Sequence, residues 1–388
     1  MTAPGEKSPA IDLPNRRQIP FKRRLAYAAV IYLGFLLLLA AIELGTRLTM
    51  AHVSSLDLFV VTSQQKAQVA DAKHSGIFEG DPLLLWRLKP NLDRAVWDYT
   101  VLSTNRQHLR SERADQHLSS KTPGTIRIVC LGDSVTFGFR VPVVWPDKPT
   151  EYDPNWLPYP MLLEKELRAA NPGRTIEVIT MAVPAYTSHQ GLAWLRRDIN
   201  KFDPDLLTIS FGWNDASFSD VPDREVIRTN TSAVGVRWLV DHSQAFAHAT
   251  RWLRSTGSVK PGSRLRPGPR VSQQEYVDNM LAMVQLAQTR SIGTIVIAAP
   301  YRDIVATAPE GALIQPYRES LRTVLQQKRV PFLEILELTE KAYPANEGWF
   351  GERIHPNHMG HRLMASELLK VMSSTGELGD LKIPALTP

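Results

Sequence analysis

The 388-residue sequence contains one cysteine, Cys130, so no intramolecular disulfide can form. Cys130 lies in the apolar run TIRIVCL and is therefore expected to be a small buried residue. No internal repeat is evident along the chain, which excludes a repeat architecture.

The excess of positive over negative charge is small outside the first residues, although the formal net charge is +6 at pH 7. Residues 1–24 hold six cations and two acids, a net +4, and this leaves only +2 for the other 364 residues. Nucleic-acid-binding proteins of the usual type carry a basic patch on their folded part, so no nucleic-acid partner is expected. The 43% of hydrophobic and 22% of charged residues indicate a folded chain with a sizeable core.

An uncharged apolar stretch of 18 residues runs from Leu25 to Ile42, directly after the cations of Lys22–Arg24. About 20 residues are needed to cross the hydrocarbon core of a bilayer. A cleaved signal peptide has a shorter apolar region of about 7–15 residues and a small-x-small site, and no convincing site follows Ala41. A helix that is apolar on all sides also fits poorly on the surface of a soluble protein. The sequence therefore predicts a transmembrane signal anchor over residues 25–46.

The basic flank of this predicted anchor sets its orientation, because Lys and Arg residues stay on the cytoplasmic side. We expect a single-pass protein of the cell (inner) membrane with a cytoplasmic basic tail at residues 1–24. Everything after about residue 47 is then periplasmic or extracytoplasmic.

Beyond residue 121 the sequence alternates between short apolar runs and segments with helical spacing. The expected strands are 125–131, 175–180, 205–211, 293–299 and 330–335, and the expected helices are 158–170, 188–202, 273–290, 315–328 and 357–372. Such alternation indicates a parallel sheet with helices on both faces. Active sites in such sheets lie beyond the carboxyl ends of the strands, so catalytic residues are expected in those loops.

Two segments depart from this alternation. Residues 47–121 are expected to form an extracytoplasmic N-terminal extension that packs on a domain at 122–388. Residues 216–271 form an insertion after the third strand, with one helix expected over about Val236–Leu253. The end of the insertion, Arg251–Arg270, has six cations and no acid. Either this stretch is a solvated loop, or it is a basic lip for an anionic or glycan substrate or for lipid headgroups.

Ser134 follows the first expected strand in the string Gly132-Asp133-Ser134. A serine on a glycine-flanked turn just past a strand is well presented as a nucleophile. The same string is compatible with a tight turn in which the serine caps a helix, and three residues do not separate the two interpretations.

Two further motifs fall in loops at the same edge of the predicted sheet. Asn214 follows the third strand, where it could donate a side-chain hydrogen bond to an oxyanion or form an Asx turn. Glu352 precedes His355 by three residues, which lets a carboxylate orient the ring through Nδ1–H and leaves Nε2 free as a general base. A surface hydrogen bond is the alternative for such a pair. Because all these loops lie at carboxyl ends of one sheet, Ser134, Asn214 and the Glu352–His355 pair could converge.

Four blocks, in order, resemble the SGNH (GDSL) hydrolase family over roughly residues 123–372. They are Ile128–Gly138 (IVCLGDSVTFG), Ala182–Leu192 (AVPAYTSHQGL), Gly212–Asp215 (GWND) and Phe350–Ala365 (FGERIHPNHMGHRLMA). The preceding segments DPLLLWRLKPN and STNRQHLRSE look like those of membrane-anchored bacterial members. The resemblance implies a three-layer α/β/α, flavodoxin-like fold with a central parallel sheet, here preceded by one N-terminal transmembrane helix.

The resemblance also implies roles for individual residues. Ser134 would be the nucleophile, His355 the base and Glu352 its orienting acid, while the oxyanion hole would be formed by the N–H groups of Ser134 and Ala185 and the side chain of Asn214. Two positions depart from the family pattern. Ala185 stands where glycine is usual, and it can supply the N–H if its backbone conformation is allowed. Glu352 stands where aspartate is usual, and it is longer by one methylene.

The spacing of His355, His358 and His361 also invites comparison with a metal site. Pro356 places His355 outside the following helix, and no cysteine or further ligand is expected nearby. In the family that this sequence resembles, the last two histidines belong to the helix start and its packing. We therefore expect no metal and no cofactor.

An acyl-serine intermediate can be resolved in two ways, which the residues alone do not separate. With water as acceptor, the protein is a membrane-anchored serine esterase for acyl esters, above all O-acetyl esters, of envelope or exported polysaccharide. With a sugar hydroxyl as acceptor, it is a glycan O-acyltransferase. Ala185 and Glu352 motivate an alternative of another class, a non-catalytic membrane-tethered glycan-binding or assembly protein. The expected partners are an acylated carbohydrate or other ester and, through the N-terminal helix, the membrane.

Overall fold

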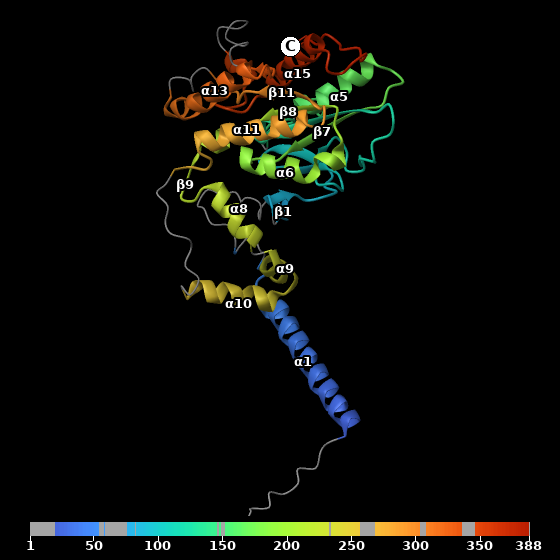
Figure 1. The fold of residues 1–388 in the computed structure, drawn as a ribbon, viewed down its shortest axis with the longest axis vertical. Helices are drawn as coiled ribbons and strands as arrows, with labels where there is room; N and C mark the ends of the chain where they lie inside the picture. Colours follow the sequence, from blue (N-terminus) through green and yellow to red (C-terminus); the bar gives the residue numbers. More distant parts are fainter. Residues whose placement is uncertain are drawn as a thin grey trace, which may run out of the picture.

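The centre of the structure is an eight-stranded sheet, counted over the residues described, in the order β12-β11-β8-β6-β7-β5-β4-β3 (Figure 1). The computed structural model describes residues 20–53, 58, 76–81, 83–145, 147–148, 152–232, 234–256, 268–302, 308–335 and 346–387. The strands of the sheet are β3 (Ala95–Trp97), β4 (Thr100–Thr104), β5 (Arg110–Ser111), β6 (Ile126–Gly132), β7 (Ile176–Ala182), β8 (Leu206–Ser210), β11 (Gly293–Ile297) and β12 (Phe332–Leu333).

Five of these strands form the parallel part of the sheet. β6 pairs with both β7 and β8, β8 pairs with β11, and β11 pairs with β12, all in parallel. Numbered along the chain, these five strands have the order 2-1-3-4-5, which is the flavodoxin-like arrangement. The main helices between and after them are α5 (Tyr159–Ala170), α6 (Ser188–Phe202), α11 (Gln273–Gln288), α13 (Pro309–Gln327) and α15 (His358–Thr375). The predicted α/β fold class is confirmed, with a sheet that is mostly parallel.

The segment before β6 continues the same sheet with antiparallel strands. β5 pairs with β7 through Arg110 and Thr180, and β4 and β3 follow outward. A separate hairpin of β1 (Phe78–Asp81) and β2 (Leu85–Leu88) packs beneath the sheet, where the Tyr186 hydroxyl donates to the carbonyl oxygen of Trp86. The antiparallel strands and this hairpin are therefore part of the body that holds the parallel strands.

Helices cover both faces of the sheet, as the continuous apolar pattern of its strands requires. Along β6, Val129 and Leu131 point into the core beneath α6, α11 and α13. Ile128 and Cys130 alternate with them and point into a second core beneath α5 and α15. Cys130 is fully buried, as predicted. Because the two faces are closed in this way, polar chemistry is confined to the ends of the strands.

The insertion after β8 differs from the prediction of one helix over about 236–253. It holds three helices among its described residues, α8 (Asp223–Ser232), α9 (Val234–His242) and α10 (Gln244–Ser255). The helical conformation is interrupted at Ser243, between α9 and α10. The Ser243 side chain accepts a hydrogen bond from Phe246 N and so caps α10. The base of the insertion is closed by β9 (Phe218–Ser219) and β10 (Gly268–Pro269). Most of the predicted basic stretch, residues 257–267, lies outside the described residues.

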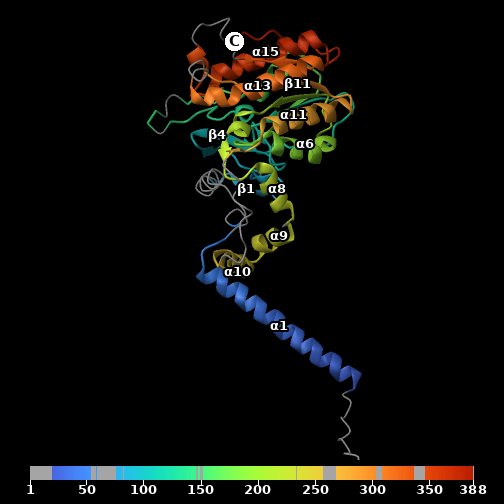
Figure 2. The same cartoon turned by 60° about the vertical axis from the view of Figure 1, so that its left-hand side comes forward.

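Helix α1 (Phe21–Thr49) projects from this body as a single rod (Figures 1 and 2). Its 29 residues make it roughly 44 Å long at about 1.5 Å per residue, and none of them is buried. In the part of the chain that the structure describes, α1 is the one helix long and apolar enough to cross a membrane. A signal sequence near the N-terminus can pass the same test of length and composition.

Candidate active site

Ser134 is the first residue of the short helix α4 (Ser134–Phe137), directly after the carboxyl end of β6. The Asp133 carboxylate caps this helix by accepting a hydrogen bond from the backbone of its first turn. Gly132 has to be glycine, because a Cβ there would lie 2.1 Å from Thr136 Oγ1. This tight change from strand to helix leaves Ser134 half-buried at the edge of the sheet.

His355 reaches Ser134 from the loop before α15. The loop is closed by an isolated bridge between Phe350 and Pro356 and by a hydrogen bond from Gly351 N to His355 O (3.0 Å). His355 Nε2 lies 2.7 Å from Ser134 Oγ, although the two residues are 221 positions apart in the chain. The distance fits a serine hydroxyl that donates to the imidazole.

Glu352 contacts the other ring nitrogen of His355. Its Oε1 accepts from Nδ1, and its Oε2 lies 3.8 Å from Arg140 Nη1. The hydrogen bond from His355 holds the pKa of Glu352 below its usual range, with the charges of His355 and Arg140 acting in the same direction. The extra methylene of glutamate therefore does not keep this carboxylate from the imidazole. Ser134, His355 and Glu352 form one hydrogen-bonded chain.

Asn214 joins the loops that follow three neighbouring strands. It lies in the one-turn helix α7 (Trp213–Ala216), after β8. Its Nδ2 donates to Tyr186 O, after β7, at 3.0 Å and to Asp133 Oδ2, after β6, at 3.4 Å. Burial raises the pKa of Asp133 to about 6. The structure thus brings Asn214 beside the turn that carries Ser134.

Ala185 occupies the loop after β7 in a left-handed backbone conformation, with φ of 67°. This region favours glycine, and an L-residue with a Cβ pays roughly 1–2 kcal/mol to enter it. The carbonyl oxygen of Ala185 accepts from Arg270 Nη1 at 2.8 Å, and Arg270 is itself paired with Asp223 at 2.8 Å in a fully buried ion pair. Among the described residues, the N–H of Ala185 donates to no acceptor. Arg270 therefore holds the loop in a conformation that its sequence does not prefer.

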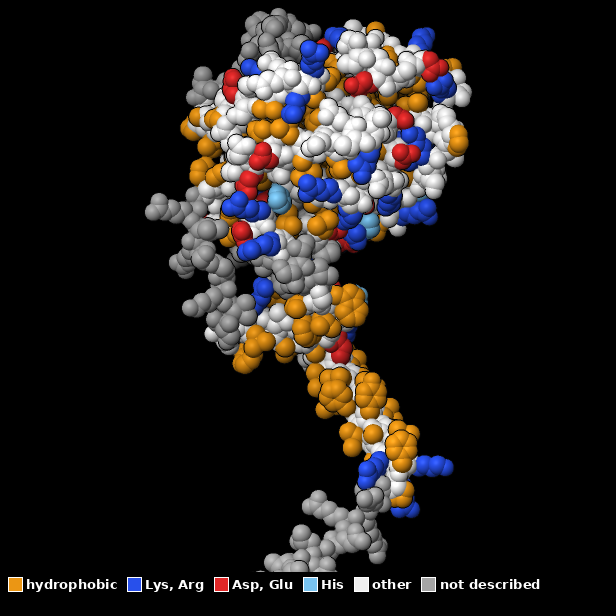
Figure 3. Space-filling view, viewed as in Figure 1, with side chains coloured by type: hydrophobic (Ala, Val, Ile, Leu, Met, Phe, Trp, Pro, Cys, Tyr) orange, Lys and Arg blue, Asp and Glu red, His pale blue; other side chains and the backbone are white. Residues whose placement is uncertain are grey.

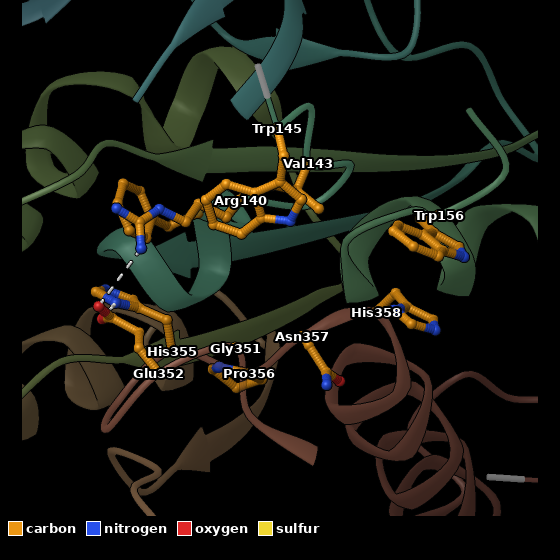
Figure 4. A pocket seen from close by; sticks show the side chains of 11 residues that line it. Arg140, Val143, Trp145, Trp156, Gly351, Glu352, His355, Pro356, Asn357 and His358 are labelled. Atoms are coloured by element: carbon orange, nitrogen blue, oxygen red, sulfur yellow. Dashed lines mark hydrogen bonds and ion pairs between the residues drawn. The ribbon is translucent and has the colours of Figure 1, made fainter. Parts of the chain in front are cut away.

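A cavity of about 190 Å³ opens beside His355 and Glu352 (Figure 4). Its walls include the rings of Trp145, Trp156 and His358 and the guanidinium group of Arg140. The Trp156 and His358 rings are stacked, with centroids 4.0 Å apart and planes 5° from parallel. The cavity therefore offers flat ring faces together with a guanidinium group next to the Ser134–His355 contact.

Sequence analysis did not single out four residues of this region. Arg140, Trp145 and Trp156 line the cavity, and Arg270 holds the Ala185 loop. Arg140 lies two positions after the first family-like block, and the two tryptophans follow it within the same long loop. That proximity was the available signal. Arg270 was noted only as the last cation of the basic stretch 251–270, and unlike a solvated or lip residue it is buried, in an ion pair with Asp223.

The three histidines of the last block have separate surroundings. His355 faces Ser134, whereas His358 stacks on Trp156. His361 is fully buried and its Nδ1 accepts from Tyr159 N at 3.2 Å; burial lowers its pKa to about 3. Within the described ranges, no group of three or more His, Cys, Asp or Glu side chains is arranged to hold a metal ion.

Comparison with protein families identifies the family to which this chain belongs. The model of the GDSL-like lipase/acylhydrolase family matches residues 130–363, which is more than half of the chain. The chain belongs to the GDSL-like lipase/acylhydrolase family. This confirms the resemblance drawn from the four sequence blocks, and it makes the chain a serine hydrolase of ester bonds.

Several solved structures are similar to this GDSL-like hydrolase at low identity. A lipase/acylhydrolase of Enterococcus faecalis is 17% identical, with 67% of this chain and 98% of that chain covered and a TM-score of 0.42. An acetylxylan esterase of Geobacillus stearothermophilus is 15% identical, with 67% and 97% covered and a TM-score of 0.42. A GDSL-like lipase of Bacteroides thetaiotaomicron is 15% identical, with 66% and 93% covered and a TM-score of 0.39. A search among curated proteins gave no match.

Proposed function

We propose that this GDSL-like hydrolase is a membrane-anchored esterase that cleaves short acyl esters of carbohydrate through a covalent acyl-serine at Ser134. One observation carries the proposal: His355 Nε2 lies 2.7 Å from Ser134 Oγ while Nδ1 of the same ring contacts Glu352. A nucleophile, a base and a group that orients the base are the minimum set for acyl transfer. Together they favour an enzyme over a non-catalytic glycan-binding protein.

In the first step Ser134 Oγ attacks the ester carbonyl carbon and its proton passes to His355 Nε2. Glu352 accepts the Nδ1–H hydrogen bond and stabilises the imidazolium that forms. The bond from carbon to the leaving oxygen then breaks, and His355 returns its proton to the departing alcohol. In the second step His355 takes a proton from water, the hydroxide oxygen adds to the acyl carbon, and Ser134 leaves with the proton from His355.

Three donors would bind the oxyanion of each tetrahedral intermediate: the N–H groups of Ser134 and Ala185 and the side-chain amide of Asn214. A single oxyanion donor is worth about 2.7–4 kcal/mol in comparable enzymes. Asn214 already holds Tyr186 O at 3.0 Å, while its 3.4 Å contact with Asp133 is longer than a strong hydrogen bond. Exchanging that weaker contact for the oxyanion costs little and leaves the stronger one to fix the amide.

The cavity beside His355 supports a short acyl group on a carbohydrate. Its volume of about 190 Å³ is below the roughly 300–1,000 Å³ of pockets that take larger ligands. The apolar faces of a sugar ring can pack on Trp145 or Trp156, and ring hydroxyls can pair with Arg140. Such flat, partly polar walls suit a sugar ester better than a long acyl chain.

The anchor and the domain division complete the proposal. α1 would cross the cell membrane with Lys22–Arg24 on the cytoplasmic side, so that the hydrolase faces outward toward envelope or exported polysaccharide. The proposed parts are a basic tail at 1–24, the anchor at 25–46, an extension at 47–121 and the catalytic domain at 122–388 with its insertion at 216–271. A phosphatase fused to the C-terminus should then be active. An inactive fusion would indicate the opposite orientation of the chain in the membrane.

Mass spectrometry of Ser134 after incubation with an acetylated oligosaccharide tests the chemistry. We expect a mass gain of one acetyl group on the Ser134 peptide, together with labelling by a fluorophosphonate, and neither in Ser134→Ala. Esters of p-nitrophenol should be cleaved faster with acetate than with octanoate. No turnover and no labelling of the parent chain would sink the proposal in favour of a binding protein.

The fate of the acetyl group separates the esterase from a glycan O-acyltransferase. The same incubation is run with an unacetylated oligosaccharide as added acceptor. Free acetate as the main product supports the esterase, whereas an acetylated acceptor would assign the transferase. Both outcomes require the same acyl-serine.

A further inference from the structure

Large apolar side chains are exposed on α9 and α10, beside the upper end of α1 (Figure 3). Of the ten exposed large hydrophobic residues that follow Met50 in the described ranges, five belong to these two short helices. They are Val236, Trp238, Leu239, Trp252 and Leu253, and Trp252 is 65% exposed. Such a concentration marks an interaction surface rather than ordinary surface composition.

On α10 the exposed apolar residues form one face. The exposed Ala249, Trp252 and Leu253 and the half-buried Ala245 follow the i, i+4, i+7, i+8 spacing of a helix stripe. The opposite face packs against Val53 and Leu58, and the side chain of Gln244 exchanges two hydrogen bonds with the backbone of Val53. The stripe is thus the side of α10 on which, among the residues that the structure describes, large apolar side chains stay exposed.

The position of α10 is set by the end of α1. The Glu43 carboxylate accepts hydrogen bonds from Ser243 Oγ (2.8 Å) and from the N–H groups of Gln244 (2.9 Å) and Ala245 (3.0 Å), and so binds the first turn of α10. Glu43 is the first charged residue after the uncharged run that ends at Ile42. α10 therefore begins at the level where the apolar part of α1 ends, and it runs across that end rather than alongside it (Figures 1 and 2).

Charge and aromatic content agree with a lipid surface at this level. Arg251 is exposed next to Trp252, whereas Arg237 is buried and Arg254 donates to the carbonyl oxygen of Leu58. Tryptophan is enriched at the boundary between headgroups and acyl chains, and cations there attract anionic lipids. A protein partner is not needed to cover a stripe that lies at the surface of the bilayer.

We propose that α9 and α10 form a monotopic element at the extracytoplasmic surface of the cell membrane. The element would lie in the membrane–water interface, with the α10 stripe against the acyl chains. The proposal rests on the membrane anchoring proposed above. An interfacial helix buries its apolar face roughly 5–10 Å into the headgroup boundary. Together with α1 it would hold the hydrolase at a defined orientation above the bilayer, whereas a single tether would let it turn freely.

The test uses the full chain in vesicles of phosphatidylethanolamine and phosphatidylglycerol that contain brominated lipid. A fluorophore is attached at Leu253→Cys, and the buried Cys130 serves as the check that the parent chain takes no label. Leu313→Cys on α13 is the matched control, since Leu313 is 40% exposed and Leu253 47%. Leu36→Cys, inside α1, reports on the anchor itself. Circular dichroism verifies that each labelled chain is folded.

We expect quenching at Leu36 and at Leu253 to exceed that at Leu313 about twofold or more, because only the first two would lie within the bilayer. Arg251→Glu should reduce quenching at Leu253 by weakening attraction to the anionic lipid. Quenching at Leu36 but not at Leu253 would overturn the interfacial proposal and leave the anchor intact. If quenching were absent at both positions and alkaline carbonate extracted the protein, the proposed membrane anchor would be contradicted as well. Cross-linking of two Leu253→Cys chains would assign the stripe to a second copy and also overturn the proposal.

Discussion

Arg140 Nη1 lies 3.8 Å from Glu352 Oε2, on a carboxylate whose other oxygen contacts His355. Arg140 also pairs with Asp98 at 2.9 Å, and its guanidinium carbon lies 4.8 Å from the ring centroid of Phe139. These contacts hold the cation in place against the carboxylate, so that Arg140 acts on the base through Glu352. We regard it as a positioning residue for the proposed reaction.

Replacing this cation tests that role. An ion pair of this exposure is worth roughly 0.2–1 kcal/mol, so Arg140→Met should lower kcat/KM about 1.4- to 5-fold. Arg140→Lys keeps the charge and should lose less. The measurement is hydrolysis of p-nitrophenyl acetate across pH. A loss as large in the Lys variant as in the Met variant would mean that the packing of Arg140, and not its charge, matters.

Glu352→Gln should lower kcat by about 10⁴-fold, because the orienting carboxylate of such a triad contributes on that scale. The pKa of Glu352 is lowered in the folded state, so its ionised form stabilises the fold above the ordinary pKa of 4.5. This stabilisation is lost as the pH falls below 4.5 through the lowered value. Denaturation of parent and variant at several pH values should therefore show their difference in stability shrinking under acid. Glu319→Gln, on an exposed i,i+3 pair, is the control and should change neither quantity appreciably.

Asn214→Ala should reduce kcat by about 10²–10³-fold if its amide binds the oxyanion. Asn171→Ala is a matched control, since the Asn171 amide likewise donates two hydrogen bonds, here to the backbone carbonyl groups of Leu167 and Lys382 at 2.8 Å each. The control should lose stability and keep its kcat. Equal kcat in both variants would leave Asn214 with a structural role alone.

Ala185→Gly should stabilise the protein by about 0–1.6 kcal/mol. Removing the Cβ relieves roughly 1–2 kcal/mol at a positive φ, and the greater freedom of glycine in the unfolded chain offsets about 0.4–1 kcal/mol of it. Because the backbone N–H is retained, kcat should stay unchanged. Urea denaturation and ester hydrolysis measure the two effects. A destabilised Gly variant would contradict the left-handed conformation of Ala185.

Trp156→Ala should raise KM for an acetylated oligosaccharide about 2- to 12-fold, the equivalent of one aromatic contact of roughly 0.5–1.5 kcal/mol. Kinetics with p-nitrophenyl acetate, which lacks a sugar ring, should be unaffected. Trp252→Ala, on the exposed face of α10, is the control for general loss of a tryptophan. A larger effect on the small ester than on the oligosaccharide would argue against a sugar at Trp156.

Local sequence was sufficient for most of the hydrolase fold. The apolar runs that became β6, β7, β8 and β11 are bounded by turn residues, and a fully buried parallel strand has no other local signature. The break at Ser243 was missed because the hydrophobic spacing continues across it. Its cap is completed by Glu43, 200 positions earlier in the chain, and no local pattern reports such a partner.

The residue types at Ser134, Asn214, Glu352 and His355 were readable from the sequence, because each motif follows a strand and strand ends meet at one edge of a parallel sheet. Their distances, the left-handed φ of Ala185 and the roles of Arg140 and Arg270 depended on folding. Hydrophobic periodicity is a local property and records which side of an element is buried. Contacts across 80 to 220 positions depend on how whole elements pack, and this is why the charge beside Glu352 and the strain at Ala185 became visible only in the folded chain.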